Sequence, residues 1–182
     1  MHARWASTSR RVRVFDELFV LAGGPSADLA LESLEALVAM ADPASRSALR
    51  SPPADPLAAL LHLIDRRLSE RGADPAPIAA LRLTPPWAAV ALAGDVYAAH
   101  VSAGLTRIAA SLPPLGRGGP LALRYVPLAR GDRFVLATAD IDSERATGPA
   151  PSIEERCRGL ALHDDEDGDE DEDGAAIVIE LL

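Results

Sequence analysis

An acidic run over residues 164–173 is the densest group of side chains that could do chemistry, because nine of its ten residues are Asp or Glu. The spacing Asp169-x-Asp171-x-Asp173-Gly, with a Glu after five further residues, matches the loop of a calcium-binding EF-hand. An EF-hand needs a helix on each side, whereas residues 177–179 are Ile-Val-Ile and favour a strand. The run therefore predicts a disordered, solvated loop that binds cations weakly or recruits a basic partner.

Other reactive residue types are scarce or lack a motif. All 18 basic residues are Arg, and the absence of Lys excludes P-loop NTPases, protein kinases and enzymes that use a Schiff-base lysine. The single Cys157 has no partner for an internal disulfide, which predicts a reducing, cytoplasmic location. The segment Gly116-Arg117-Gly118-Gly119 could cradle a phosphate, but no helix is predicted after it, so a flexible hairpin loop is favoured.

The charge of the chain is concentrated in one place. The formal net charge is -9, and nine of the 27 acidic residues lie in residues 164–173, so the remaining acidic residues equal the 18 arginines in number. A net negative charge argues against nucleic-acid binding, which depends on basic side chains that neutralise phosphates. The apolar stretches end before the ~20 residues of a membrane span, so neither membrane insertion nor secretion is expected.

The hydrophobic pattern predicts the elements that must position any site. Helices are expected from Ser26 to the Asp42-Pro43 pair, over residues 55–72, and from the capping pattern of Ser152 and Glu155 to about residue 162. Gly94-Asp95 is typical of a two-residue hairpin turn. Strands are expected over residues 11–22 (one or two), 78–83, 87–93, 96–101, 105–109, 121–126, 133–138 and 175–181. This order indicates one α+β layered domain over residues 1–182, with antiparallel strands.

Four segments in this order carry a family resemblance: residues 18–24, 90–98, 128–138 and 173–180. Together they resemble the glycine loop, the Gly-Asp-Ser-Arg segment, the Arg-Gly-Asp strand and the terminal Asp-Asn strand of the metal-dependent serine/threonine protein phosphatases, the PPM or type 2C family. The resemblance implies the layered PPM fold, with antiparallel sheets packed between helices and a shortened N-terminal end. The glycine-turn motif positions are Gly23, Gly24, Gly94 and Asp95.

That family hydrolyses phosphoserine and phosphothreonine esters with two divalent cations, Mn or Mg, held by carboxylates. The resemblance places Asp173 at the position of the final metal ligand, whereas Ala139 replaces another ligand and no Asp precedes Gly23. Asp140 stands one residue late, and successive strand residues point to opposite faces. Arg13 is the candidate phosphate-binding residue that the resemblance implies.

The loss of carboxylates predicts a pseudophosphatase that needs no cofactor and acts by binding a signalling protein, a kinase or a phosphoprotein. One alternative is an active phosphatase with a reduced metal site, in which Asp140, Asp173 and Asp16 hold a single Mn or Mg ion. A second alternative makes the acidic loop the functional part, as a partner-binding or cation-binding segment.

Overall fold

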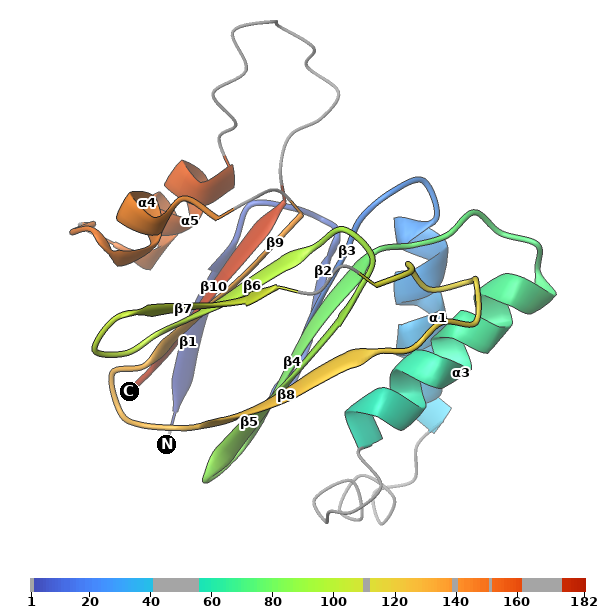
Figure 1. The fold of residues 1–182 in the computed structure, drawn as a ribbon, viewed down its shortest axis with the longest axis horizontal. Helices are drawn as coiled ribbons and strands as arrows, with labels where there is room; N and C mark the ends of the chain where they lie inside the picture. The colour runs from blue at the N-terminus through green and yellow to red at the C-terminus, as the bar shows by residue number, and fades with distance from the viewer. Residues whose placement is uncertain (1, 41–55, 110–111, 139–140, 151, 162–174) are drawn as a thin grey trace, which may run out of the picture.

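Two five-stranded antiparallel sheets packed face to face form the centre of the molecule (Figure 1). The computed structural model describes residues 2–40, 56–109, 112–138, 141–150, 152–161 and 175–182. Sheet A has the order β1-β10-β9-β6-β7 and sheet B the order β2-β3-β4-β5-β8, and every neighbouring pair is antiparallel. The strands are β1 Ala3–Ser7, β2 Val12–Phe15, β3 Leu18–Ala22, β4 Ile78–Thr84, β5 Trp87–Ala93, β6 Tyr97–Val101, β7 Leu105–Ala109, β8 Ala122–Pro127, β9 Arg133–Ala137 and β10 Ala176–Leu181.

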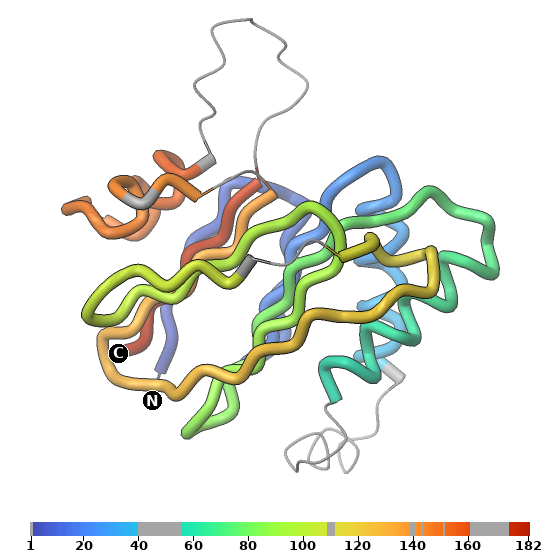
Figure 2. Tube along the Cα trace, viewed as in Figure 1, coloured from blue at the N-terminus to red at the C-terminus, as the bar shows by residue number. Residues whose placement is uncertain are grey.

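Helices cover the outer face of each sheet, as the Cα trace also shows (Figure 2). The helices α1 (Ala27–Met40) and α3 (Pro56–Glu70) pack on sheet B, and α4 (Ser143–Thr147) and α5 (Ile153–Ala161) pack on sheet A. The four layers confirm the predicted α+β architecture. Within the described residues, no helix is long and apolar enough to cross a membrane.

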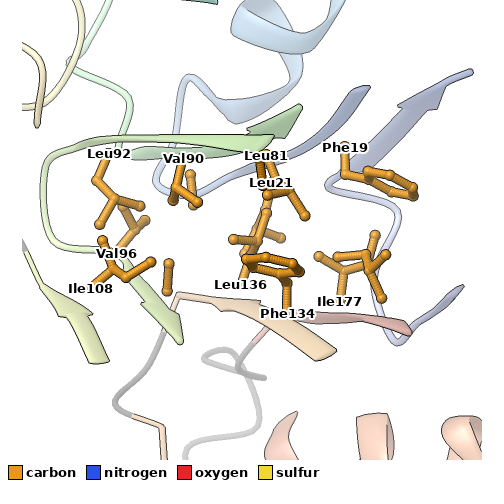
Figure 3. Packing of buried hydrophobic residues seen from close by; sticks show 14 of the residues in the cluster. Phe19, Leu21, Leu81, Val90, Leu92, Val96, Ile108, Phe134, Leu136 and Ile177 are labelled. Atoms are coloured by element: carbon orange, nitrogen blue, oxygen red, sulfur yellow. The ribbon is translucent and has the colours of Figure 1, made fainter. Parts of the chain in front are cut away.

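The central strands are buried on both faces, which explains their nearly continuous apolar sequences. In β3, Phe19 and Leu21 enter the core between the sheets, while Val20 and Ala22 pack against the helices. Figure 3 shows the side chains of sheet B meeting those of sheet A across this core. Several helix-facing positions of sheet B are alanines, which lets α1 and α3 approach closely: Ala22, Ala80, Ala91 and Ala93.

Most predicted elements are confirmed to within a residue or two. Residues 11–22 form two strands joined at Asp16, whose φ of 50° is a left-handed conformation that Asp tolerates better than most residues. In α3, the apolar stripe of Leu57, Leu61, Ile64 and Leu68 is buried as the pattern predicts. The helix α5 begins after Ser152, whose Oγ accepts a hydrogen bond from the backbone N–H of Glu155 at 3.2 Å.

Two glycine turns connect different sheets, so the prediction of a hairpin at Gly94-Asp95 is wrong. Strand β5 lies in sheet B and β6 in sheet A, and the chain crosses between the sheets at Gly94. The turn at Gly131-Asp132 joins β8 of sheet B to β9 of sheet A in the same way. The turn over Ser102–Gly104 does close a hairpin, between β6 and β7.

Two short elements carry too little apolar sequence to be predicted. Strand β1 is an edge strand in which Ala6 is the buried residue, and it pairs with β10. Helix α4 begins at Asp142, whose side chain accepts hydrogen bonds from the backbone N–H groups of Glu144 and Arg145. The acidic run at 164–173 lies outside the described residues, so the predicted loop stays a prediction.

Candidate functional site

The strand ends that carry the sequence motifs meet at one end of the sandwich. Gly23, which follows β3 of sheet B, donates its N–H to the carbonyl of Pro77 at 2.8 Å. Thr138 directly follows β9 of sheet A, and a Cβ built on Gly23 would lie 3.3 Å from its Cγ2 atom. Thr138 is in turn paired with Ala175, because the backbone N–H of each donates to an oxygen atom of the other at 2.9 Å.

Gly94 packs against Pro77, the residue whose carbonyl accepts the N–H of Gly23. The φ of Gly94 is +81°, and a Cβ at this position would lie 2.9 Å from Cα and Cβ of Pro77 and 3.0 Å from Cβ of Pro114. The turn therefore needs glycine both for its backbone conformation and for the close approach. Described residues from all four motif segments thus lie around Pro77 or around Thr138.

Comparison with solved structures assigns this architecture, whereas no family model and no curated protein matches the sequence. PppA, a regulatory component of T6SS in Pseudomonas aeruginosa, is 20% identical with a TM-score of 0.65, and the match covers 100% of this chain and 99% of that one. The PPM Ser-Thr phosphatase MsPP of Mycobacterium smegmatis, solved with cacodylate, is 16% identical, with a TM-score of 0.66 over 100% of this chain and 99% of that one. The chain has the fold of the PPM serine/threonine phosphatases. A further similar structure is the catalytic domain of the phosphatase PstP with two manganese ions, 16% identical, with a TM-score of 0.61 over 97% of this chain and 96% of that one.

The described part of the motif site in this PPM fold does not supply a set of metal ligands. Mn²⁺ and Mg²⁺ need several hard oxygen ligands, mainly carboxylates. Ala22, just before Gly23, is fully buried against the helices, and Asp95 beside Gly94 is exposed. Among the described residues, no three His, Cys, Asp or Glu side chains gather in a way that could hold a metal ion. Ala139, Asp140 and Asp173 lie outside the described residues, so the predicted roles of the two Asp residues stay predictions.

Two other candidate site residues lie away from Gly23. Arg13 forms an ion pair with Glu35 of α1, and its Nη1 donates to the carbonyls of Arg10 and Val12 at 2.6 and 3.0 Å. These contacts occupy the guanidinium on the helix-facing side of sheet B, and a phosphate-binding role for Arg13 stays a prediction. Asp16 lies at the opposite end of β3 from Gly23, which rules it out as a ligand shared with the motif site.

The glycine-rich segment at 116–119 has an internal carboxylate in place of a phosphate. The backbone N–H groups of Gly116 and Gly118 donate to Oδ1 of Asp65 at 2.6 and 3.2 Å. Ser69 adds a hydrogen bond from its Oγ to the carbonyl of Gly116 at 2.9 Å. The predicted hairpin is wrong, because the segment joins β7 of sheet A to β8 of sheet B and is bound to α3.

We expect Asp65→Ala to lower the free energy of unfolding by about 2 kcal/mol, because two backbone donors lose an acceptor from a buried carboxylate. Urea denaturation followed by circular dichroism measures the loss. Asp74→Ala is the matched control, since Asp74 is exposed, and it should change stability by less than about 0.5 kcal/mol. An equal loss in both variants would contradict the role of Asp65.

The thiol of Cys157 is not a nucleophile in this environment. It is buried under α5, and its Sγ donates to the carbonyls of Ala6 and Ala176 at 3.3 and 3.4 Å. Burial raises the pKa of Cys157 to about 11, so the thiol stays protonated at neutral pH. The residue therefore serves the packing of α5 on sheet A.

Proposed function

We propose that this chain is a PPM-type pseudophosphatase that acts as a binding or regulatory module in phospho-signalling. The observation that carries the proposal is the loss of carboxylates at the motif site. No Asp precedes Gly23, where the resembled glycine loop has a metal-binding Asp, and Ala139 stands where a second one belongs. Two-metal hydrolysis needs both cations to neutralise charge on the phosphoryl oxygens and to activate water.

The partner class follows from the structures that share the fold. PppA is described as a regulatory component of a secretion system, so a PPM fold can serve regulation. We infer that this chain binds a signalling protein, a kinase or a phosphoprotein and needs no metal ion for that binding. A shared PPM architecture whose described residues include no set of metal ligands supports this binding role.

The purified chain should release no phosphate from p-nitrophenyl phosphate or from a phosphoserine peptide above the rate without protein, with Mn²⁺ or Mg²⁺ added. The physical reason is that a lone carboxylate at Asp173 does not hold two cations. A malachite-green or absorbance assay of released product measures the rate. Asp173→Ala should leave this background unchanged.

One result would replace the proposal with the alternative of a reduced but active metal site. That result is manganese-dependent hydrolysis that Asp173→Ala abolishes and Asp95→Ala preserves. Asp95 is the matched control because it is an exposed Asp in the neighbouring turn. The alternative would then rest on Asp140 and Asp173, since Asp16 lies at the far end of β3.

A further inference from the structure

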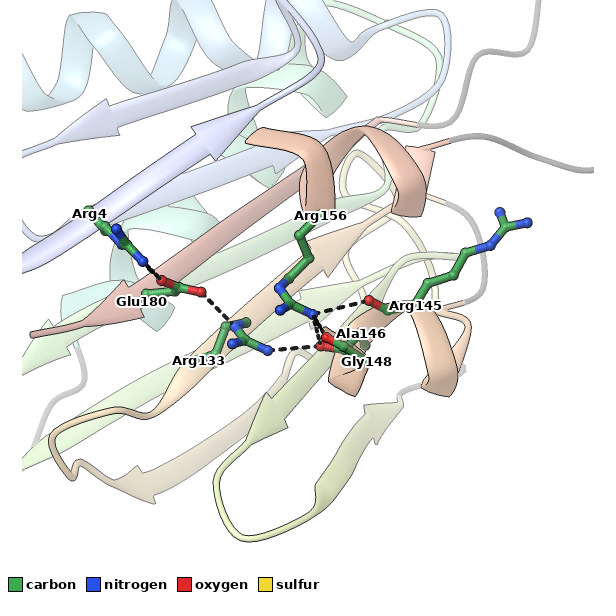
Figure 4. A network of polar contacts seen from close by, with 7 residues as sticks. All are labelled: Arg4, Arg133, Arg145, Ala146, Gly148, Arg156 and Glu180. Atoms are coloured by element: carbon green, nitrogen blue, oxygen red, sulfur yellow. Dashed lines mark hydrogen bonds and ion pairs between the residues drawn. The ribbon is translucent and has the colours of Figure 1, made fainter. Parts of the chain in front are cut away.

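A cavity of about 270 Å³ lies at the opposite end of sheet A from the motif site. The charged side chains that line it are those of Arg4, Arg133, Arg156 and Glu180, three guanidinium groups and one carboxylate (Figure 4). Arg133 begins β9 and Thr138 follows its end, so the two sites are separated by the length of that strand, ~15 Å at ~3.3 Å per residue. The cavity is therefore distinct from the motif site.

Two of the arginines already share Glu180. Arg4 donates from Nε and Nη2 to Oε2 at 2.8 and 2.6 Å, and Arg133 donates from Nε to Oε1 at 2.9 Å. These bonds outweigh the effect of burial and hold the pKa of Glu180 below its ordinary value, so the carboxylate is ionised at neutral pH. Both carboxylate oxygens are thus committed to Arg4 and Arg133.

Arg156 is a buried cation without a carboxylate of its own among the described residues. Its side chain is held by carbonyl groups at the end of α4, because Nη1 donates to Gly148 at 2.6 Å, to Ala146 at 3.1 Å and to Arg145 at 3.4 Å. The residue is 8% exposed, and neither its Nε nor its Nη2 donates to another described residue. Burial, and then the nearby charge of Arg133, lower the pKa of Arg156 by more than the charge of Glu180 raises it.

We propose that this cavity binds the phosphate group of a phosphate monoester through Arg4, Arg133 and Arg156. Guanidinium groups present paired donors that match phosphate oxygens, and such charge-assisted hydrogen bonds are among the strongest in proteins. The three guanidinium side chains outnumber the one carboxylate side chain, and this excess of positive side-chain charge favours a phosphate monoester dianion over a single carboxylate. The cavity volume suits a phosphate with a short stem, since ordinary small-molecule pockets begin at about 300 Å³.

Calorimetric titration of the whole chain with O-phospho-L-serine tests the proposal, with inorganic phosphate, a phosphoserine peptide and acetate as further probes. We expect saturable binding of phosphoserine and no binding of acetate. Arg4→Ala should weaken phosphoserine binding by about tenfold, the effect of losing one charge-assisted hydrogen bond. Arg4 is a suitable target because 57% of its side chain is exposed, so its loss leaves the core intact.

Arg66→Ala is the matched control, because Arg66 is also an exposed arginine paired with one glutamate, Glu70, but on α3. It should bind phosphoserine as the unchanged chain does. No binding, equal weakening by Arg4→Ala and Arg66→Ala, or equal binding of acetate would each overturn the proposal. Tighter binding of the peptide than of inorganic phosphate would identify a phosphorylated protein as the source, and equal binding would identify a free phosphate compound. This result is independent of hydrolysis at the motif site.

Discussion

Gly94→Ala is expected to lower the free energy of unfolding by about 2–5 kcal/mol. A left-handed φ costs a residue with a Cβ about 1–2 kcal/mol, and overpacking a close contact adds about 1–3 kcal/mol. The added Cβ would lie 2.9 Å from Cα of Pro77, which is backbone and cannot rotate away. Urea denaturation followed by circular dichroism at 25 °C measures the loss.

Gly131→Ala separates the two contributions. Gly131 also has a positive φ, +87°, and lies in the glycine turn that joins β8 to β9, but a Cβ there meets nothing within 4 Å. Gly131→Ala should therefore cost about 1–2 kcal/mol, the conformational part alone. If the two variants lose the same stability, the close packing of Gly94 on Pro77 does not hold the motif site together.

The strands of this fold could be predicted from sequence, whereas their distribution between two sheets could not. Residues 87–93 and 133–138 are apolar runs with strand propensity, and both form strands close to the predicted bounds. Gly94-Asp95 and Gly131-Asp132 each satisfy the local requirements of a turn, because a positive φ serves a hairpin and a crossover equally. The pairing of strands that are far apart in the sequence decides between a hairpin and a crossover. The residues of the turn itself do not indicate that pairing.

The candidate site, like the fold, could be predicted from sequence only in part. The order of the four motif segments indicates the family resemblance, and the structure then places Gly23, Gly94 and Thr138 at one end of the sandwich. The arginine cavity was missed because its residues are spread over nearly the whole chain and form no motif. One signal could have indicated it, since Glu180 is a single charge in an otherwise apolar strand and such a residue usually has a buried partner.

The contact between Asp65 and the segment at 116–119 could not be predicted from sequence, for a related reason. The local sequence at 116–119 predicts backbone donors for either a phosphate or no partner. The structure supplies an acceptor from α3, where Asp65 is a charged residue among the buried positions of an amphipathic helix. A carboxylate on the apolar face of a helix is therefore a useful sequence signal for a buried loop contact.

Asp132→Ala should lower the free energy of unfolding at pH 7 by about 2–4 kcal/mol. Asp132 is buried in the turn from β8 to β9, where its Oδ2 accepts the N–H of Ala129 at 2.9 Å and lies 3.0 Å from Nε2 of His100. His100 also stacks on Phe134, with ring centroids 4.8 Å apart, so it cannot move away to find water. Removing the carboxylate leaves the backbone N–H of Ala129 and the imidazole of His100 without this partner.

The same carboxylate should make stability depend on pH. Burial alone would raise the pKa of Asp132, but the hydrogen bond from Ala129 and the interactions with His100 and Ser102 outweigh burial and lower it. A folded-state pKa below that of the unfolded chain means that the stabilisation is complete above about pH 4 and is lost as the pH falls further. Urea denaturation at pH 7, 5, 4 and 3 should therefore show the difference between the unchanged chain and Asp132→Ala shrinking below pH 4. Asp132→Asn keeps an acceptor for Ala129 and should therefore lose less stability at pH 7 than Asp132→Ala. If the difference in stability between the unchanged chain and Asp132→Ala stays constant with pH, the role of the ionised carboxylate is refuted.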